Sequence, residues 1–354
     1  MAASLASAES QKSPRSPGFS LIEILVALAI LSLIMVIVLQ MISETERTWK
    51  HSAGRTQGFQ SARIAFETVY RSVSEATLNT YYDYYAADRS RRTTLNSAGF
   101  VPAIYGRYSE LHFISGKQLV TQPRPQITHS VFFQTPASYT ATTASYGTMT
   151  SLLNGVGFYI DFTSDAADRP TFFSGLTKQP PARYRYRLME FFQPTEELTV
   201  YGSTTGTAWF TTPLKATSPR TVLLAENIIA CVICPHLPNE LTPATPGTTL
   251  SADYEYDSRV ASTPWTAGAQ PANMHQLPPL VRVVLIAVDE ASMVKIQGAS
   301  TTQPDLGFNY SLVFQKPVNL TADIATVSDA LTAKHINFRV FQTDVPVRSA
   351  QWSN

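Results

Sequence analysis

A single carboxylate, Glu23, interrupts the most apolar stretch of the chain, which runs from Phe19 to Ile42. The other polar side chains in this run are Ser20, Ser32 and Gln40. As a helix the run spans about 36 Å, enough to cross a hydrocarbon core of about 30 Å. A charge at the bilayer centre costs about 2.5–3.5 kcal/mol, but a carboxylate one turn from the helix end can reach the headgroups. In a packed bundle of helices the same carboxylate needs a cation.

The landmark for processing lies before this helix. Gly18 follows a polar leader that carries Lys12 and Arg15, and no small-residue pattern for signal peptidase follows Ile42. A cut after Gly18 would leave the apolar helix on the mature protein, with Phe19 as its new N-terminus. Glu23 would then be the fifth residue of the mature chain.

Charge sets the expected orientation and argues against one class of partner. Basic residues precede the helix, whereas mixed charges follow it, at Glu44, Glu46, Arg47 and Lys50. This asymmetry favours a cytoplasmic leader and a single pass through the inner membrane, with the large C-terminal part on the periplasmic side. The formal net charge is +1, so no basic field for nucleic acid is present and no nucleic acid is predicted.

The segment Gly18-Phe19-Ser20-Leu21-Ile22-Glu23 resembles the cleavage and methylation motif of type IV prepilins and type II secretion pseudopilins. The resemblance implies cleavage between Gly18 and Phe19 and N-methylation of Phe19 by a prepilin peptidase/methyltransferase. It also implies that Glu23 sets filament register by pairing with the Phe19 amine of a neighbouring subunit. The alternative is a glutamate stranded at the end of a membrane anchor. Ser16 and Pro17 stand where many members carry Lys or Arg.

A narrower resemblance extends along most of the chain. The segments that are similar to the Verru_Chthon cassette protein C family are 75–85, 129–136, 184–198, 225–238, 253–258 and 275–292. The pair of segments LLAENI and LPPLVRVVLIAV is also similar to minor pseudopilins of the J type. Both resemblances imply a type IV pilin-like α+β fold, with a long N-terminal helix packed on a β-rich globular head.

The residues that follow the apolar run predict an amphipathic continuation of the helix. Apolar side chains recur at spacings of three and four, at Phe59, Ala62, Phe66, Val69, Val73 and Ala76. Such a stripe is expected to face a sheet, and a heptad seam for a coiled-coil partner is the alternative. No proline lies between Phe19 and Thr80, so one long helix is expected, with Gly54 and Gly58 as its bending points.

Beyond residue 80 the composition predicts strands and long loops. Runs rich in β-branched and aromatic residues are 110–114, 130–134, 157–162, 183–192, 221–233, 281–288, 310–314 and 337–341. Stretches with loop composition are 135–151, 202–220, 241–251 and 262–279. The expected organisation is a leader (1–18), a transmembrane and polymerisation helix (19–42), its amphipathic continuation (43–79) and a β-rich head (80–354).

Two cysteines, Cys231 and Cys234, form a lone CxxC within an expected strand. Residues three apart in a strand point to opposite faces, and no second pair completes a four-thiolate zinc site. Buried free thiols and a local disulfide at Pro235 are both compatible with the spacing, and a disulfide is permitted outside the membrane.

Two polar segments of the head could form binding sites. TYYDYYAADRSRR (80–92) clusters four tyrosines with aspartates and arginines, as in a recognition surface, or it ends the long helix with tyrosines wrapped onto the sheet. DYEYDS (253–258) places Asp253, Glu255 and Asp257 at alternate positions, where they could bind Ca²⁺ or form a solvated loop. The loop reading is favoured because no Ca²⁺-loop glycine or distal glutamate follows.

Enzyme chemistry finds no support in the sequence. The histidines are scattered, at positions 51, 112, 129, 236, 275 and 335, and no HExxH, GxSxG, P-loop or dinucleotide motif is present. We therefore expect no catalytic residues, no metal site and no cofactor.

The function expected is that of a minor prepilin-like subunit that sits in or at the tip of a type IV pilus-like or type II secretion-like filament. Its expected partners are membrane lipid before assembly, other pilin or pseudopilin subunits, the inner-membrane assembly platform and the processing enzyme. The rival readings are a membrane-tethered adhesin or ligand-binding protein and an anchored enzyme.

Overall fold

The chain divides into two compact units, residues 1–53 and 54–354. The computed structural model describes residues 20–93, 98–121, 125–149, 151–175, 179, 181–202, 206–216, 220–238, 249–260, 265 and 268–352. The expected leader and both residues of the expected cleavage junction, Gly18 and Phe19, lie outside the described residues. The second unit, which adds the end of the long helix to the β-rich region 80–354, is called the head below.

The first element is one long helix, α1 (Leu21–Ser74). Its length is possible because the sequence offers no proline, which would remove a backbone donor and clash with the preceding turn. Gly54 and Gly58, the expected bending points, both lie inside α1. The long helix that the sequence predicts is therefore confirmed.

The larger sheet of the head has six strands, each antiparallel to its neighbours. Their order across the sheet is β7 (Thr221–Glu226), β6 (Tyr184–Gln193), β5 (Asn154–Ser164), β4 (Ile127–Thr135), β3 (Ile114–Lys117) and β9 (Tyr256–Asp257). The central strands alternate, so that Phe132 faces one side while Val131 and Phe133 face the other. This period of two gives the sheet two apolar faces, and each is covered by other elements.

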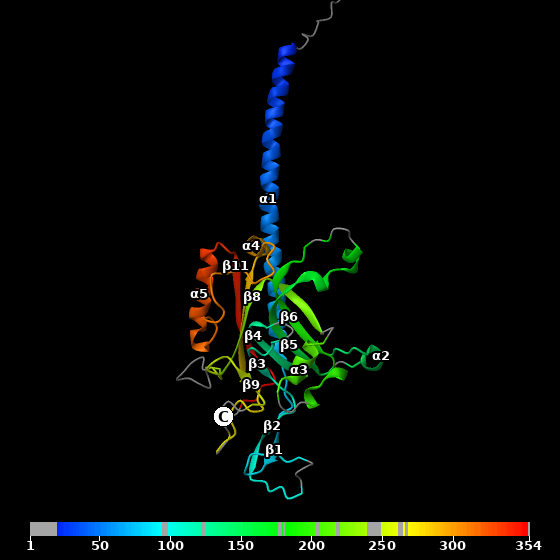
Figure 1. The fold of residues 1–354 in the computed structure, drawn as a ribbon, viewed down its shortest axis with the longest axis vertical. Coiled ribbons are helices and arrows are strands. Elements are labelled where there is room, and N and C mark those ends of the chain that lie inside the picture. The colour runs from blue at the N-terminus through cyan, green and yellow to red at the C-terminus, as the bar shows by residue number, and fades with distance from the viewer. Residues whose placement is uncertain are drawn as a thin grey trace, which may run out of the picture. The chain divides into compact units, whose positions relative to one another are not determined.

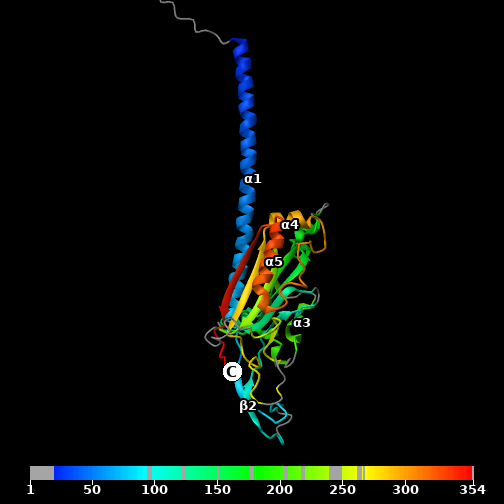
Figure 2. The same ribbon diagram turned by 90° about the vertical axis from the view of Figure 1, so that its left-hand side faces the viewer.

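The smaller sheet has three antiparallel strands and lies against the larger one. Its order is β11 (Phe338–Pro346), β10 (Leu280–Val288) and β8 (Ile228–His236). All nine residues of β8 are buried, which is why this strand reads as a continuous apolar run. Helix α5 (Leu320–Ala333) lies over this sheet and adds Val327 and Leu331 to its core (Figures 1 and 2).

The amphipathic end of α1 completes this core. Ala62, Val69 and Val73 are buried in the same hydrophobic cluster as β4, β8 and β10. Arg63 and Glu67 are exposed off this face, where they form an ion pair of 3.0 Å. The expectation that the apolar stripe faces a sheet is therefore confirmed.

The opposite face of the larger sheet is covered by α3 (Ala208–Leu214). Phe132 stacks on Phe210 with ring centroids 3.9 Å apart. Gly157, which pairs with Phe132 across β4 and β5, leaves room for this ring, because a Cβ at that position would lie 2.0 Å from Phe132 Cδ1.

The remaining elements lie at the periphery of the head. The helices are α2 (Thr143–Tyr146) and α4 (Glu290–Gln297), and the short 3₁₀ turns are η1 (Asp165–Asp168), η2 (Thr171–Gly175), η3 (Thr195–Glu197), η4 (Val200–Gly202) and η5 (Pro317–Asn319). A separate two-stranded hairpin pairs β1 (Tyr81–Tyr85) with β2 (Ile104–Tyr108) (Figure 1).

Several sequence expectations for the head are wrong in detail. The expected strand 221–233 is two strands, because Asn227 adopts a φ of 62° and the chain passes there from the larger sheet to the smaller one. The run 310–314 forms turns, with Phe314 at a φ of 57°. The run 110–114 reaches the sheet only at its last residue, where β3 begins. The stretch 202–220, expected to be a loop, contains α3.

Candidate functional site

The start of α1 is a capping box built from Ser20 and Glu23. Ser20 Oγ accepts the Ile22 N–H at 3.3 Å, and Glu23 Oε2 accepts the Ser20 N–H at 2.9 Å. Each side chain thus satisfies a backbone donor that the first turn of a helix leaves without a partner. The Ser-x-x-Glu spacing is the sequence signal for this cap, and treating Glu23 only as a charge overlooks it.

The apolar part of α1 has no protein cover among the described residues. From Leu21 to Ile42 every large apolar side chain is between 46% and 78% exposed. Residues 21–46 are long and apolar enough to cross a membrane, and an 18-residue window within them has a mean hydropathy of 3.1. Exposure of this much apolar surface to water is strongly unfavourable, so lipid or other helices must cover it.

The hydroxyl groups on this part of α1 are satisfied within the helix itself. Ser32 Oγ donates to the Ala29 carbonyl at 2.8 Å, and Ser43 Oγ donates to the Gln40 carbonyl at the same distance. Internal satisfaction matters because a hydrocarbon environment supplies no partner for a polar group. Glu23 differs from these hydroxyl groups in having capacity left over: within the described residues, its Oε1 accepts no hydrogen bond.

The two cysteines lie in β8, where both thiols are free and buried. This is the first of the two arrangements that the sequence leaves open, and the alternative, a disulfide between Cys231 and Cys234, is not formed. The period of two along a strand directs residues three apart to opposite faces. Burial raises the pKa of each thiol to about 12, so neither is a reactive thiolate near neutral pH.

The tyrosines of the segment 80–92 lie on the β1–β2 hairpin. The expectation that they end the helix and wrap onto the sheet is wrong, because α1 ends at Ser74 and the chain then turns into this separate pair of strands. Tyr85 is buried, but Tyr82, Tyr84 and Tyr105 are 52%, 50% and 61% exposed.

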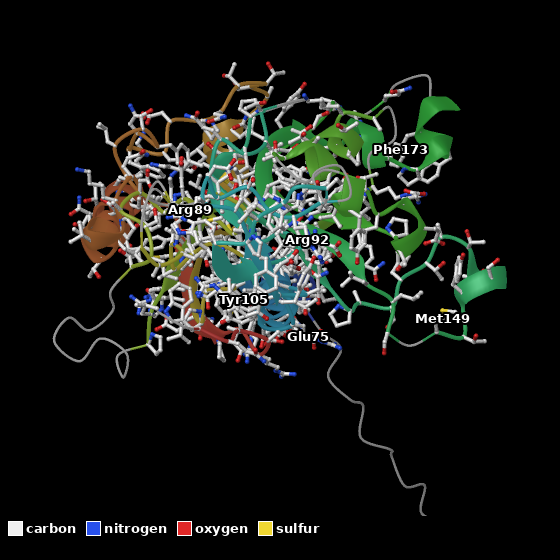
Figure 3. The ribbon with its side chains drawn as sticks, turned by 90° about the horizontal axis from the view of Figure 1, so that it is seen from below. Glu75, Arg89, Arg92, Tyr105, Met149 and Phe173 are labelled. Atoms are coloured by element: carbon white, nitrogen blue, oxygen red, sulfur yellow. The ribbon has the colours of Figure 1, made fainter. Side chains whose placement is uncertain are left out.

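These three exposed rings form one surface, called the tyrosine face below. Tyr82 stacks on Tyr105 with centroids 5.3 Å apart, and Tyr84 lies 5.1 Å from the same ring. Figure 3, which views the head from below, labels Tyr105 on this hairpin. On the other side of the hairpin, the Arg91 guanidinium lies 3.8 Å from the Tyr108 ring and pairs with Asp83 at 3.1 Å.

The acidic segment 253–258 is engaged in local structure. Asp253 Oδ1 accepts the Ser251 hydroxyl at 2.6 Å, which holds the pKa of that carboxyl below its usual value. Asp257 Oδ1 accepts from the backbone N–H groups of Arg259 and Val260. Among the described residues no group of three or more His, Cys, Asp or Glu side chains is arranged to hold a metal ion.

Asp257 also belongs to a chain of hydrogen bonds with His112 and Trp209 that no sequence pattern predicts. Trp209 Nε1 donates to His112 Nδ1 at 3.0 Å, and His112 Nε2 lies 2.8 Å from Asp257 Oδ1. Because Nδ1 accepts from the indole, the imidazole proton is on Nε2 and is donated to the carboxylate. Burial lowers the pKa of His112, so the ring is neutral and ties α3 to the sheet.

Residues 14–39 match the family model of the prokaryotic N-terminal methylation motif. Searches of curated proteins and of solved structures found no match. The motif falls on the junction at Gly18 and Phe19, Glu23 and most of the exposed apolar helix. It supports placing the chain in the type IV pilin-like superfamily, a class of structural subunits, and the fold of a long N-terminal apolar helix followed by a β-rich head is consistent with that class.

The motif has consequences for partners and location. A prepilin motif implies processing by a prepilin peptidase and assembly with other pilin subunits. The apolar helix near the N-terminus fits membrane anchoring. The methylation motif covers residues 14–39 only, so it indicates the class of the protein. It carries no information on the function of the head.

Proposed function

We propose that the chain is a minor prepilin-like subunit of a type IV pilus-like or type II secretion-like filament. In this proposal the leader is removed between Gly18 and Phe19, Phe19 is N-methylated, and α1 passes from the inner membrane into a bundle of stems. The proposal also includes the resemblance of the chain to the Verru_Chthon cassette protein C family, with J-type pseudopilin features in the head.

One observation carries the proposal. The exposed apolar part of α1 begins with the carboxylate of Glu23, and within the described residues its Oε1 accepts no hydrogen bond. Lipid covers the helix before assembly, and neighbouring helices cover it afterwards, so the apolar surface is buried in both states. The free Oε1 of Glu23 is available to the Phe19 amine of a neighbour, which is largely protonated at neutral pH. In the packed state that cation compensates a charge that would be costly to leave unpaired.

The minor or tip position is supported by the size of the head. Residues 54–354 form a unit with two sheets and a protruding hairpin, which is difficult to repeat densely along a fibre. Abundance in sheared filaments tests this point. A protein present at the level of the major subunit would contradict a tip or low-copy role.

The experiment that tests the proposal is mass spectrometry of the mature N-terminus. The expected result is a chain that begins with N-methylated Phe19, while the Gly18→Ala variant retains its leader. Ser7→Ala, in the leader but away from the junction, is the matched control and should be processed normally. A wild-type protein that still begins at Met1 would overturn the proposal.

The tyrosine face favours a second candidate function, that of a membrane-tethered adhesin. Half-exposed tyrosine side chains offer both an apolar ring and a polar hydroxyl group. They therefore suit recognition of a partner that has apolar and polar groups side by side, such as a sugar ring. Affinity electrophoresis of the full chain in hydroxyethyl cellulose tests it. Retardation that disappears in Tyr105→Ala supports the adhesin, and migration independent of the polysaccharide contradicts it.

A further inference from the structure

A cleft at the β7 edge of the larger sheet contains a carboxylate, Glu190, that has no hydrogen-bond or ion-pair partner among the described residues. The cleft has a volume of about 860 Å³, within the range of about 300–1,000 Å³ that is usual for small-molecule sites. Its walls come from β6, β7, the end of α3 and the segment before α2. The residues that line it are Tyr139, Glu190, Phe192, Glu197, Pro213, Ala216, Arg220, Thr221 and Val222.

The strand neighbours of Glu190 on its own face of the sheet are apolar. It pairs with Phe158 on β5 and Val222 on β7, and Leu188 and Phe192 flank it along β6. Among the described residues no side chain or backbone group donates a hydrogen bond to it or forms an ion pair with it. Burial raises the pKa of the Glu190 carboxyl, the direction expected when no cation compensates the charge.

The other carboxylate of the cleft is already occupied. Glu197 forms a two-pronged pair with Arg220, whose Nε lies 2.9 Å from Glu197 Oε2. The guanidinium of Arg220 is therefore engaged by Glu197, and it forms no ion pair with Glu190. A cation that enters the cleft would find one carboxylate without a partner.

The aromatic wall of the cleft is held in place. Tyr139 and Phe192 meet edge to face with centroids 4.8 Å apart. The backbone of Tyr139 is fixed from both sides by Asn154, which accepts its N–H at 2.9 Å and donates to its carbonyl at 2.7 Å. An organic cation gains from aromatic rings and from a carboxylate in the same partly dry site.

We propose that this cleft binds an alkylammonium group, with the charge at Glu190 and the apolar stem against Tyr139, Phe192 and Val222. The group could be a free alkylamine or a lysine side chain, which share the same chemistry. The site lies in the head and does not depend on the proposed role of α1, so either proposal can fail without the other.

The test is a ligand-observed NMR titration of the full chain in a nonionic detergent. The probes are n-butylammonium chloride, a capped Gly-Lys-Gly peptide and, for comparison, n-butanol. Both amines are expected to bind at least tenfold more tightly than n-butanol, which corresponds to about 1.4 kcal/mol. Tighter binding of the peptide would identify a protein lysine as the source, and tighter binding of butylammonium would identify a free amine.

Variants connect the binding to the named residues. Glu190→Gln keeps the shape of the side chain and removes its charge, so the Kd for n-butylammonium should rise at least tenfold. Tyr139→Ala should raise it about two- to fivefold, while Tyr139→Phe retains the ring and the affinity. Glu255→Gln, which removes an exposed charge outside the cleft, is the matched control. Equal binding of n-butanol and the amines, or unchanged affinity in Glu190→Gln, would overturn the proposal.

Discussion

Acidification is expected to destabilise the head through His129. This side chain lies in β4 and is fully buried. Its Nδ1 accepts the Ile233 N–H of β8 at 3.2 Å, and its Nε2 donates to the Phe314 carbonyl at 3.1 Å. The ring therefore joins the two sheets and the turn at 310–314 in its neutral form. A second proton would have to sit on Nδ1, where it would face the backbone N–H.

The magnitude follows from the pKa. Burial lowers the pKa of His129 from 6.5 to about 4, and the nearby Lys117 charge acts in the same direction. A lowering of the pKa from 6.5 to about 4 corresponds to about 3 kcal/mol. Between these two values the unfolded chain binds a proton that the folded chain does not. His129 therefore makes its full contribution to the free energy of unfolding above pH 6.5. This contribution falls as the pH drops from 6.5 towards 4, and below pH 4 it changes no further.

The assay compares the full chain with His129→Gln in a nonionic detergent, using urea unfolding followed by tryptophan fluorescence, to which the buried Trp209 contributes. Burial also lowers the pKa of His275 to about 4, so the wild-type slope contains at least two histidines and only the difference between proteins isolates His129. Between pH 7 and 4 the variant should lose about 3 kcal/mol less than the wild type. The exposed His335 supplies the control, since His335→Gln should retain the wild-type pH dependence. Identical pH dependence in His129→Gln and the wild type would refute the reasoning.

Three further substitutions have defined outcomes. Gly157→Ala should lower the free energy of unfolding by about 3 kcal/mol, because its Cβ would meet the Phe132 ring; urea unfolding measures this, and a neutral effect would contradict the packing. Trp209→Phe should cost about 1–3 kcal/mol in the same assay, since His112 Nδ1 loses its donor, and unchanged stability would argue against that hydrogen bond. Glu23→Ala should leave cleavage intact but reduce recovery in sheared filaments, and normal recovery would count against a register role.

The sequence predicts those helices and strands whose local residue pattern alone determines the secondary structure and the buried face. The spacing of Ala62, Val69 and Val73 places one apolar face on a helix, and the structure buries that face. The strands β5, β6 and β10 fall where β-branched and aromatic residues concentrate. In each case burial follows from local pattern alone, so no knowledge of distant segments is needed.

The parts that the sequence misses depend on contacts between distant residues. The apolar run 221–233 gives no sign that Asn227 turns the chain into another sheet, because the constraint comes from Glu290, which accepts its amide at 2.7 Å. Helix α5 is overlooked although its buried residues Leu320, Val327 and Leu331 recur at helical spacing, because threonine and alanine dominate the rest of the segment. The cleft around Glu190 likewise needs the register of β6 against β7, which no sequence pattern supplies.

The capping box at the start of α1 refines the proposed role of Glu23, because a carboxylate has two oxygens. Oε2 holds the Ser20 N–H, and that amide persists if the chain is cut before Phe19, since Ser20 then remains the second residue. The local bond and a bond from Oε1 to a neighbour's amine can therefore coexist, and assembly need not break the helix start. Glu23→Gln separates the two roles: its amide oxygen can still cap the helix, but its charge is gone. If charge sets register, Glu23→Gln should fail to enter filaments as Glu23→Ala does, whereas rescue by Gln would mean that the helix cap is what assembly requires.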